Sequence, residues 1–369
     1  MTSRERIDRI FKGQEIDRPA LKLWGYSPGM KLLHDDYKDV VTLAEKYTDV
    51  FSGWSAPFNL IYGADWNKYV TEDIKDTYDP LWYEIHTTVN TPAGKLHSVF
   101  RASRIGDPGF CTEYLLKSPE DVLTLLSIPY EPEPVNVDGY YEEERRIGDS
   151  GITIYHLPHA GYGLQSLCGS ENFSYFYYDD NAIVHQFIST MASRLYDHTK
   201  MILDTGLKTY FGWVDPEVFI PPLTSTQIFE EVVFYYDKPL CDLLRNAGCY
   251  VWMHCHGKVR HLIDRFIEMG IDVINPLEPP KNGNIDMYEL VDYYSGRIGL
   301  EGNIEIQDIL MSPNDTLKLL IEDCVSAGRK SGRFTLCPSA GFNEYAIPGK
   351  RYIDNLKTYI THGYKCVNN

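Results

Sequence analysis

The sequence predicts an α/β fold, a (β/α)8 TIM barrel formed by the whole chain, residues 1–369, as a single domain. Three observations lead to this prediction. From about residue 151 onward, apolar runs of strand length alternate with helix-length amphipathic segments, which is typical of a parallel sheet. Six such strands and two nearer the start make eight, the number that closes a barrel. Polar side chains follow these strands where each one ends, at the edge where barrels carry their sites.

Two features at the front of the chain lie outside the repeat. Residues 3–12 predict a short amphipathic helix, an N-terminal extension, because Thr2 and Glu5 form a capping box before an apolar stripe. Residues 20–24 and 49–53 are the first two expected strands. Between them and the later repeat, residues 66–117 show short alternating runs separated by turn residues, which predicts an insertion of β-hairpins.

The back of the chain supplies the remaining elements. We expect helices over 225–247 and 259–267, among others, and the six strands at 151–156, 207–213, 249–255, 271–278, 297–301 and 333–337. Gly270 stands where the second of these helices should end, as glycine commonly does at a C-cap.

Composition excludes several classes of function. The formal charge of −17 argues against a nucleic-acid or anionic-membrane surface, because both attract basic patches. The eight cysteines include no CxxC pair, and a chain of this length needs no disulfide framework. The first residues lack an apolar signal core and no run is long enough for a membrane span, so we expect a cytoplasmic protein.

The stretch 249–257 carries the most distinctive pattern. As a strand, it places Tyr250, Trp252, His254 and His256 on one face, and the two histidines come just before Gly257. Two imidazoles at i and i+2 can bind one metal ion, and zinc would then need a third ligand. Glu217, Glu278 and Cys337 qualify by type. The alternative is a pair of histidines that are hydrogen-bonded to neighbours or act as acid–base groups.

Other polar and aromatic side chains follow the expected strands in the same way. Because the carboxyl ends of parallel strands share one rim, we expect them to form a binding or catalytic surface there. They are Trp24, Tyr26, His156, His159, Asp215, Glu217, Asn275, Glu278, Glu301, Asn303, Cys337, Ser339 and Glu344.

Taken together, the motifs resemble those of the uroporphyrinogen decarboxylase superfamily, over nearly the whole chain and most strongly from about 207 to 345. The matching segments are Arg4 to Pro19, Ser225 to Gly257, Gly270 to Glu278, Gly302 to Ile304 and Pro338 to Gly341. The resemblance implies a (β/α)8 barrel with its site at the carboxyl rim.

Two branches of that superfamily carry out different chemistry. The decarboxylases hold the carboxylates of a tetrapyrrole with an arginine-rich segment after the first strand, whereas residues 23–30 contain no arginine. The cobalamin-dependent methyltransferases bind zinc through His-x-Cys and a later cysteine. His254 matches the first ligand, His256 replaces the first cysteine, and Ala340 stands where the second would be, three residues after Cys337.

These departures lead to a specific hypothesis. Imidazole and carboxylate ligands leave zinc a harder Lewis acid than thiolates do, which suits an oxygen leaving group. We therefore expect a zinc-dependent methyltransferase that moves a methyl group from a small O-methyl, or similarly methylated, substrate to cobalamin. A separate corrinoid protein would carry the cobalamin, because the chain lacks an Asp-x-His-x-x-Gly segment. A uroporphyrinogen decarboxylase-type lyase, and a barrel that only binds a partner, remain as alternatives.

The hypothesis assigns a role to each candidate. His254, His256 and Glu217 would bind the metal, with Glu278 as the second choice for the third ligand. Glu278 and Asp215 are the catalytic candidates. The expected substrate-binding residues are Trp24, Tyr26, His156, Trp213, Glu301, Asn303, Cys337 and Glu344. Two copies of the chain could also associate as a homodimer.

Overall fold

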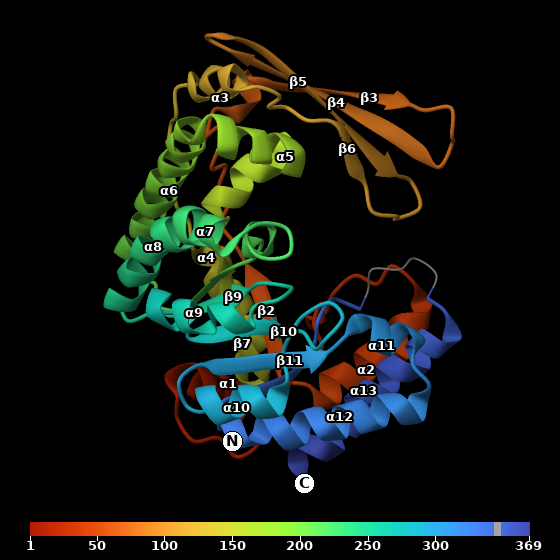
Figure 1. Ribbon diagram of the computed structural model, residues 1–369. Coiled ribbons are helices and arrows are strands. Elements are labelled where there is room, and N and C mark those ends of the chain that lie inside the picture. The colour runs from red at the N-terminus through yellow and green to blue at the C-terminus, as the bar shows by residue number, and fades with distance from the viewer. Residues whose placement is uncertain (343–347) are drawn as a thin grey trace.

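A computed structural model describes residues 1–342 and 348–369. Eight parallel strands form a curled sheet in the order β1-β12-β11-β10-β9-β8-β7-β2 (Figure 1). All eight strands lie where the sequence predicts them. Their bounds are β1 Ala20–Leu21, β2 Val50–Trp54, β7 Gly151–His156, β8 Tyr210–Trp213, β9 Tyr250–His254, β10 Val273–Leu277, β11 Gly299–Ile304 and β12 Phe334–Pro338.

Helices pack around the outside of this sheet (Figure 1). The described helices are α1 Ser3–Lys12, α2 Lys38–Tyr47, α3 Pro119–Leu126, α4 Asp138–Ile147, α5 Ala160–Asp179, α6 Asn181–Asp204, α7 Thr226–Ile228, α8 Tyr235–Asn246, α9 Ile263–Met269, α10 Met287–Tyr294, α11 Ile306–Met311, α12 Asn314–Gly328 and α13 Lys350–Asn368. The long helix predicted over 225–247 contains one π-helical stretch, Phe229–Phe234, between α7 and α8. Gly270 ends α9 in a left-handed conformation, as its position predicts.

Helix α1 packs against one end of the curl and contributes to a small inner core. Ile7, Ile10 and Phe11 are buried together with Ile154 and Trp252, which come from the inward faces of strands. The Phe11 ring lies 4.7 Å from that of Tyr210, the first residue of β8. The amino-terminal end of the sheet is therefore occupied by apolar packing, and the carboxyl end is left for polar side chains.

The curl has a seam between its two edge strands. β1 pairs with β12 and β2 pairs with β7, so the ladder is not continued from β1 to β2. Among the described residues, one backbone hydrogen bond joins them, from Asp49 N–H to the Leu21 carbonyl at 2.7 Å. The Asp49 carboxylate adds a bond from Leu21 N–H, also 2.7 Å long. The sheet thus has the strand order of a barrel, and among the described residues the backbones of its two edges are hydrogen-bonded only near their amino-terminal ends.

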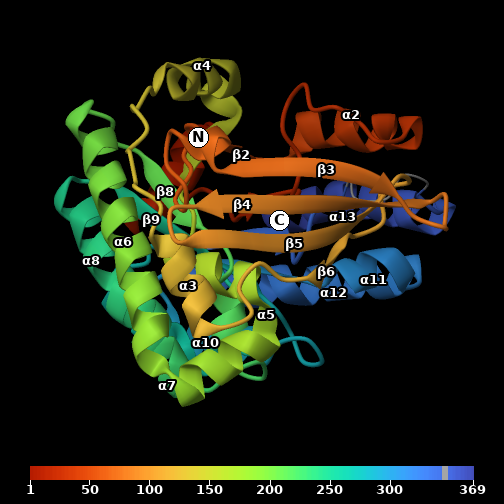
Figure 2. The same ribbon diagram turned by 90° about the horizontal axis from the view of Figure 1, so that it is seen from above.

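A second, antiparallel sheet lies between β2 and α3. Its strands are β3 Val70–Asp76, β4 Trp82–Thr91, β5 Gly94–Ser103 and β6 Phe110–Glu113, in that order. These strands occupy the region where alternation predicts hairpins. Figures 1 and 2 show that this sheet stands apart from the curled sheet and overhangs α11 and α13. Within the described part of the chain, no helix combines the length and the apolar character needed to cross a membrane.

Candidate active site at the end of strands β9 and β10

Two histidines lie next to each other where β9 ends. The His254 and His256 rings are 4.5 Å apart, centre to centre, and nearly perpendicular. Strand alternation puts both on the inward face of the sheet, while Val251, Met253 and Cys255 are buried beneath the helices, as the sequence predicts. His254 also stacks on the Trp24 indole, with the two rings 4.8 Å apart and 13° from parallel.

An amide fixes the orientation of the His254 ring. Asn275 donates from Nδ2 to the Cys337 sulfur at 3.5 Å, so its Oδ1 faces His254 Nδ1, which is 2.5 Å away. An oxygen acceptor requires that Nδ1 carries the proton, and the lone pair of His254 is then on Nε2. Burial, together with the neighbouring His256, lowers the pKa of His254 to about 3. His254 is therefore a neutral imidazole with Nε2 available as a ligand or an acceptor.

A carboxylate plays the equivalent role for His256. Glu278 accepts from His256 Nδ1 at 2.9 Å, and its other oxygen accepts from Gly257 N–H at 2.7 Å. Burial by itself would lower the pKa of His256, but the hydrogen bond and charge of Glu278 outweigh it and raise the pKa. Glu278, predicted as a catalytic group or a metal ligand, thus orients His256 from behind.

The third predicted metal ligand is close enough to influence the pair electrostatically but does not complete a site. Burial raises the pKa of Glu217, and the His256 charge partly opposes that rise. The Glu217 Oε2 atom is buried without a hydrogen-bond partner. Among the described residues, however, no group of three His, Cys, Asp or Glu side chains is assembled to hold a metal ion. Asp215 precedes Glu217 in a left-handed conformation (φ 83°), and burial raises its pKa too.

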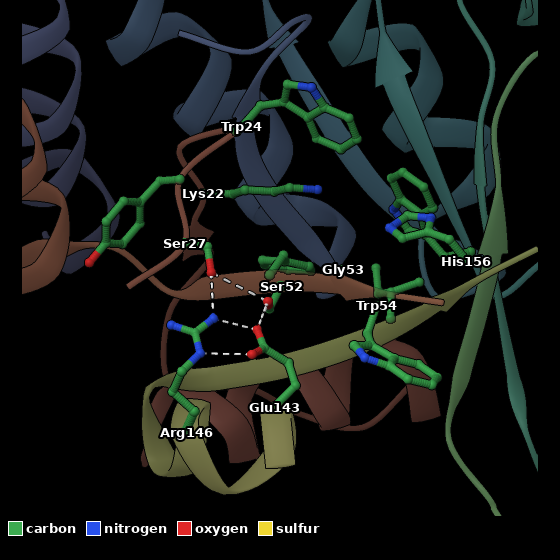
Figure 3. A pocket seen from close by; sticks show the side chains of 14 residues that line it. Lys22, Trp24, Ser27, Ser52, Gly53, Trp54, Glu143, Arg146 and His156 are labelled. Carbon is green, nitrogen blue, oxygen red and sulfur yellow. Dashed lines mark hydrogen bonds and ion pairs between the residues drawn. The ribbon is translucent and has the colours of Figure 1, made fainter. Parts of the chain in front are cut away.

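A cavity of about 500 Å³ lies beside the histidines, at the seam between β1 and β2 (Figure 3). We call it the seam cavity. Trp24, which stacks on His254, forms part of its wall, and so do two further predicted residues, Tyr26 and His156. Its lining consists of Lys22, Trp24, Gly25, Tyr26, Ser27, Phe51, Ser52, Gly53, Trp54, Glu143, Arg146, Ile154, His156 and Trp252.

Both ionisable groups predicted here remain neutral at physiological pH. Burial lowers the pKa of His156 to about 4, and the nearby Lys22 charge contributes. Burial raises the pKa of Tyr26 to about 12. The predicted residues Trp24, Tyr26 and His156 therefore lie together, around a space that is large enough for a small molecule.

Two predicted substrate-binding residues have other roles. Trp213 faces outward, where its Nε1–H donates to Asp237 of α8 at 3.1 Å, because the alternation along β8 turns Gly212 inward instead. Glu301 faces inward, but both its oxygens are already bound. One accepts from Lys22 Nζ and the other from Trp252 Nε1, each at 2.6 Å. Neither Trp213 nor Glu301 lines the seam cavity, and their assignment to substrate binding stays a prediction.

Two further predicted substrate-binding residues, Asn303 and Cys337, also lie away from the seam cavity. Asn303 lies at a different cavity, of about 220 Å³, together with residues of α10 and α12, and its N–H donates to Cys324 of α12 at 3.2 Å. Cys337 is fully buried, its thiol donates to the Pro338 carbonyl at 3.2 Å, and its sulfur accepts from Asn275 Nδ2. Glu344 lies outside the described residues.

Sequence reasoning did not predict the role of Lys22. This residue is buried in the inner face of the sheet, with its Nζ 4.3 Å from the Trp24 ring centre and 4.5 Å from that of Phe51. The available signal was a single lysine inside the apolar run 20–24, because a charge in a strand core requires a buried partner. Asn275 was placed at the rim but was given no role.

The comparisons with known proteins agree with this fold. The family model for uroporphyrinogen decarboxylase (URO-D) matches residues 164–361, more than half of the chain. The chain therefore belongs to the uroporphyrinogen decarboxylase family. Among solved structures, a methyltransferase from Methanosarcina mazei is similar, with a TM-score of 0.61 and 12% identity over 99% of both chains. At that identity the likeness concerns the fold. No curated protein matches the sequence.

Proposed function

We propose that this protein is a methyltransferase that removes a methyl group from a small O-methylated, or similarly methylated, substrate and transfers it to cobalamin on a separate corrinoid protein. The observation that supports it is the histidine pair. Both Nδ1 atoms of His254 and His256 are engaged from behind by Asn275 and Glu278. This is the arrangement typical of metal-binding histidines, whose second nitrogen is held by an amide or carboxylate.

The donor atoms present suit zinc in kind, although only two are assembled. His254 and His256 would supply two Nε2 ligands, and Glu217, with its unpartnered buried oxygen, would be the third. Zinc bound there would act as a Lewis acid on the oxygen from which the methyl group departs. The chain's own contribution is to hold two imidazole donors in fixed orientations next to a cavity lined in part by aromatic rings.

Decarboxylation of a tetrapyrrole is the alternative, and the seam cavity argues against it. A substrate with many carboxylates needs cations that are available to bind it. Lys22 and Arg146 are the cations that line the cavity, and each is already paired with a carboxylate, Glu301 and Glu143 respectively. An added anionic substrate would have to displace these partners.

Metal analysis of the purified protein is the first test. We expect stoichiometric zinc that is lost in His254→Ala and in His256→Ala, because either change leaves a single nitrogen ligand. His261→Ala is the matched control, since His261 is exposed and lies on the following segment. Zinc retained in both pair variants, or absent from a folded wild-type protein, would refute the proposed metal site.

The reaction is tested with free cob(I)alamin in place of the corrinoid protein. Methanol, anisole and dimethyl ether serve as methyl donors, and methylcobalamin is followed by its absorbance. We expect methylcobalamin with at least one oxygen-linked donor, and none with the double variant His254→Ala/His256→Ala. Conversion of uroporphyrinogen to coproporphyrinogen by the wild-type protein would instead support the lyase.

A further inference from the structure

The seam cavity passes through the wall of the curled sheet. Four consecutive residues of β2, from Phe51 to Trp54, all line it, although successive side chains of a strand point to opposite faces. Phe51 lies inside, 4.5 Å from Lys22 Nζ, whereas Ser52 points outward and donates to Glu143 of α4. A single cavity can reach both faces only by passing around the free edge of β2.

The other edge of the opening is β1, which is also unpaired on the side that faces β2. β1 ends at Leu21, and the chain beyond it turns away through Tyr26, whose N–H bonds to the Leu23 carbonyl. The cavity therefore extends from Trp252, fully buried inside the sheet, to Arg146, whose side chain is 41% exposed on α4. In Figure 3 Glu143 and Arg146 stand on one side, Trp24 on the other, and Lys22 lies between them.

A small polar network closes the outer end. Arg146 donates to Glu143 at 2.7 Å, to Ser27 Oγ at 2.8 Å and to the Pro28 carbonyl. Ser27 and Ser52, on the two sides of the seam, have their hydroxyl oxygens 3.4 Å apart. These contacts, which we call the seam latch, are made mainly by side chains and reach from Ser52, which is buried, to Arg146 at the surface. They can open without breaking any strand pairing.

The lining also indicates what could enter. The two cations of the cavity are each offset by a carboxylate, so the space carries no net charge for an ionic guest. Its walls include the rings of Trp24, Trp54 and Trp252. Flat aromatic surfaces of this kind favour a flat guest that can stack on them.

We propose that the seam cavity is an entry and binding site through which a small, flat, uncharged molecule reaches the histidine pair from the side. The identification of this molecule as the methyl donor rests on the proposed function. The Trp24 indole connects the two places, since it lines the cavity and stacks on His254. A donor entering through the wall would leave the carboxyl end of the sheet available to the corrinoid partner.

The test measures the rate at which a probe molecule binds. It requires neither zinc nor cobalamin, so it can fail independently of the methyltransferase reaction. The probe is 4-nitroanisole, whose binding should quench tryptophan fluorescence in a stopped-flow mixing experiment. In the variant Ser27→Cys/Ser52→Cys, oxidation joins the two sides of the seam and reduction releases them. We expect the oxidised form to bind the probe on the order of tenfold more slowly than the reduced form of the same protein.

A second variant does not depend on forming a disulfide. Arg146→Ala removes the centre of the seam latch and should speed both association and dissociation by about two- to fivefold, as expected for one partly exposed ion pair. Arg145→Ala, at the next and exposed position of α4, should leave the rates unchanged. A charged analogue, 4-methoxybenzoate, should bind more weakly than 4-nitroanisole.

Several results would overturn the proposal. They are the absence of 4-nitroanisole binding to the wild-type protein, equal rates in the oxidised and reduced double-cysteine protein, or unchanged rates in Arg146→Ala. Tighter binding of 4-methoxybenzoate would show that the cavity selects an anion instead of an uncharged guest.

Discussion

The two sides of the curled sheet are built differently. At β9 and β10 the strands pair in register, His254 opposite Asn275, and the polar side chains bind one another in a fixed network. At β1 and β2 the ladder is missing and the side chains surround a cavity instead. Trp24 joins the sides, because it lines the cavity and stacks on His254.

This difference separates two requirements of a site. Chemistry needs groups held in one geometry, which a paired strand and a second layer of hydrogen bonds provide. Entry of a small molecule needs space and contacts that can open, which an interrupted ladder and a latch of side-chain contacts provide. The predictions below test whether the two sides really differ in this way, beginning with the largest expected effect.

The buried ion pair on the inner wall of the seam cavity should be the most sensitive point. Lys22→Met leaves Glu301 as an unpaired carboxylate that is fully buried, and we expect a loss of about 3–5 kcal/mol in the free energy of unfolding. Urea denaturation measures the change. Adding Glu301→Gln removes the uncompensated charge but keeps an acceptor for Trp252, and should restore much of the stability. A double variant as unstable as Lys22→Met would contradict this account.

The amide behind His254 should affect metal binding rather than entry. Asn275→Ala removes the acceptor that orients the ring, and we expect zinc affinity to fall by about 10- to 100-fold, as for other residues behind metal ligands. Competition with a chromophoric chelator gives the affinity. The rate of 4-nitroanisole binding should stay unchanged in the same variant. If that rate changes as much as the zinc affinity, the two sides are not separate.

The sequence predicts the β9–β10 side of the sheet better than the β1–β2 side. Period-two alternation identified the inward face of β9 and therefore the histidine pair, and the count of eight strands predicted the sheet. Alternation also divides the side chains of β8 between two faces, but it does not say which face is inward. That orientation depends on neighbours such as Trp252, which lies against Gly212 and leaves room only for glycine there, and so Trp213 was misplaced.

The seam could not be predicted from local patterns. The run 20–24 reads as a complete strand, yet its ladder with β12 ends at Leu21. Alternation within one strand does not encode where the ladder with its neighbour stops. The partner of Lys22 is Glu301, 279 residues further along the chain. A buried lysine indicates that a partner exists, but periodicity carries no information about which residue it is. The same holds for Asn275 and Cys337, which meet only across β11.

The histidines of the two sides should also make the free energy of unfolding depend on pH in opposite directions. His156, at the seam, has a pKa lowered to about 4 by burial and by Lys22, whereas Glu278 raises the pKa of His256. In the unfolded chain a histidine titrates near pH 6.5. The unfolded state therefore binds the His156 proton first as the pH falls, and stability is lost between about pH 6.5 and 4.

We expect His156 to account for about 2 kcal/mol of that loss, since the side chain is partly exposed and the full shift is discounted accordingly. Unfolding by urea at pH 7 and at pH 4.5 gives the difference. His156→Gln should show a smaller drop than the wild-type protein, and His261→Gln, at an exposed position, should change the drop less than His156→Gln does. An identical pH dependence in wild type and His156→Gln would mean that burial at the seam does not hold His156 neutral.

The seam latch should contribute little to stability. Arg146→Ala removes contacts of a side chain that is 41% exposed, and we expect a loss of less than about 1 kcal/mol in the free energy of unfolding. Urea denaturation measures it beside Arg145→Ala. The same change is expected to speed 4-nitroanisole binding, so stability and entry should separate in one variant. A large destabilisation would show that Arg146 holds the two edges of the sheet together, in which case the seam is a structural joint rather than an opening.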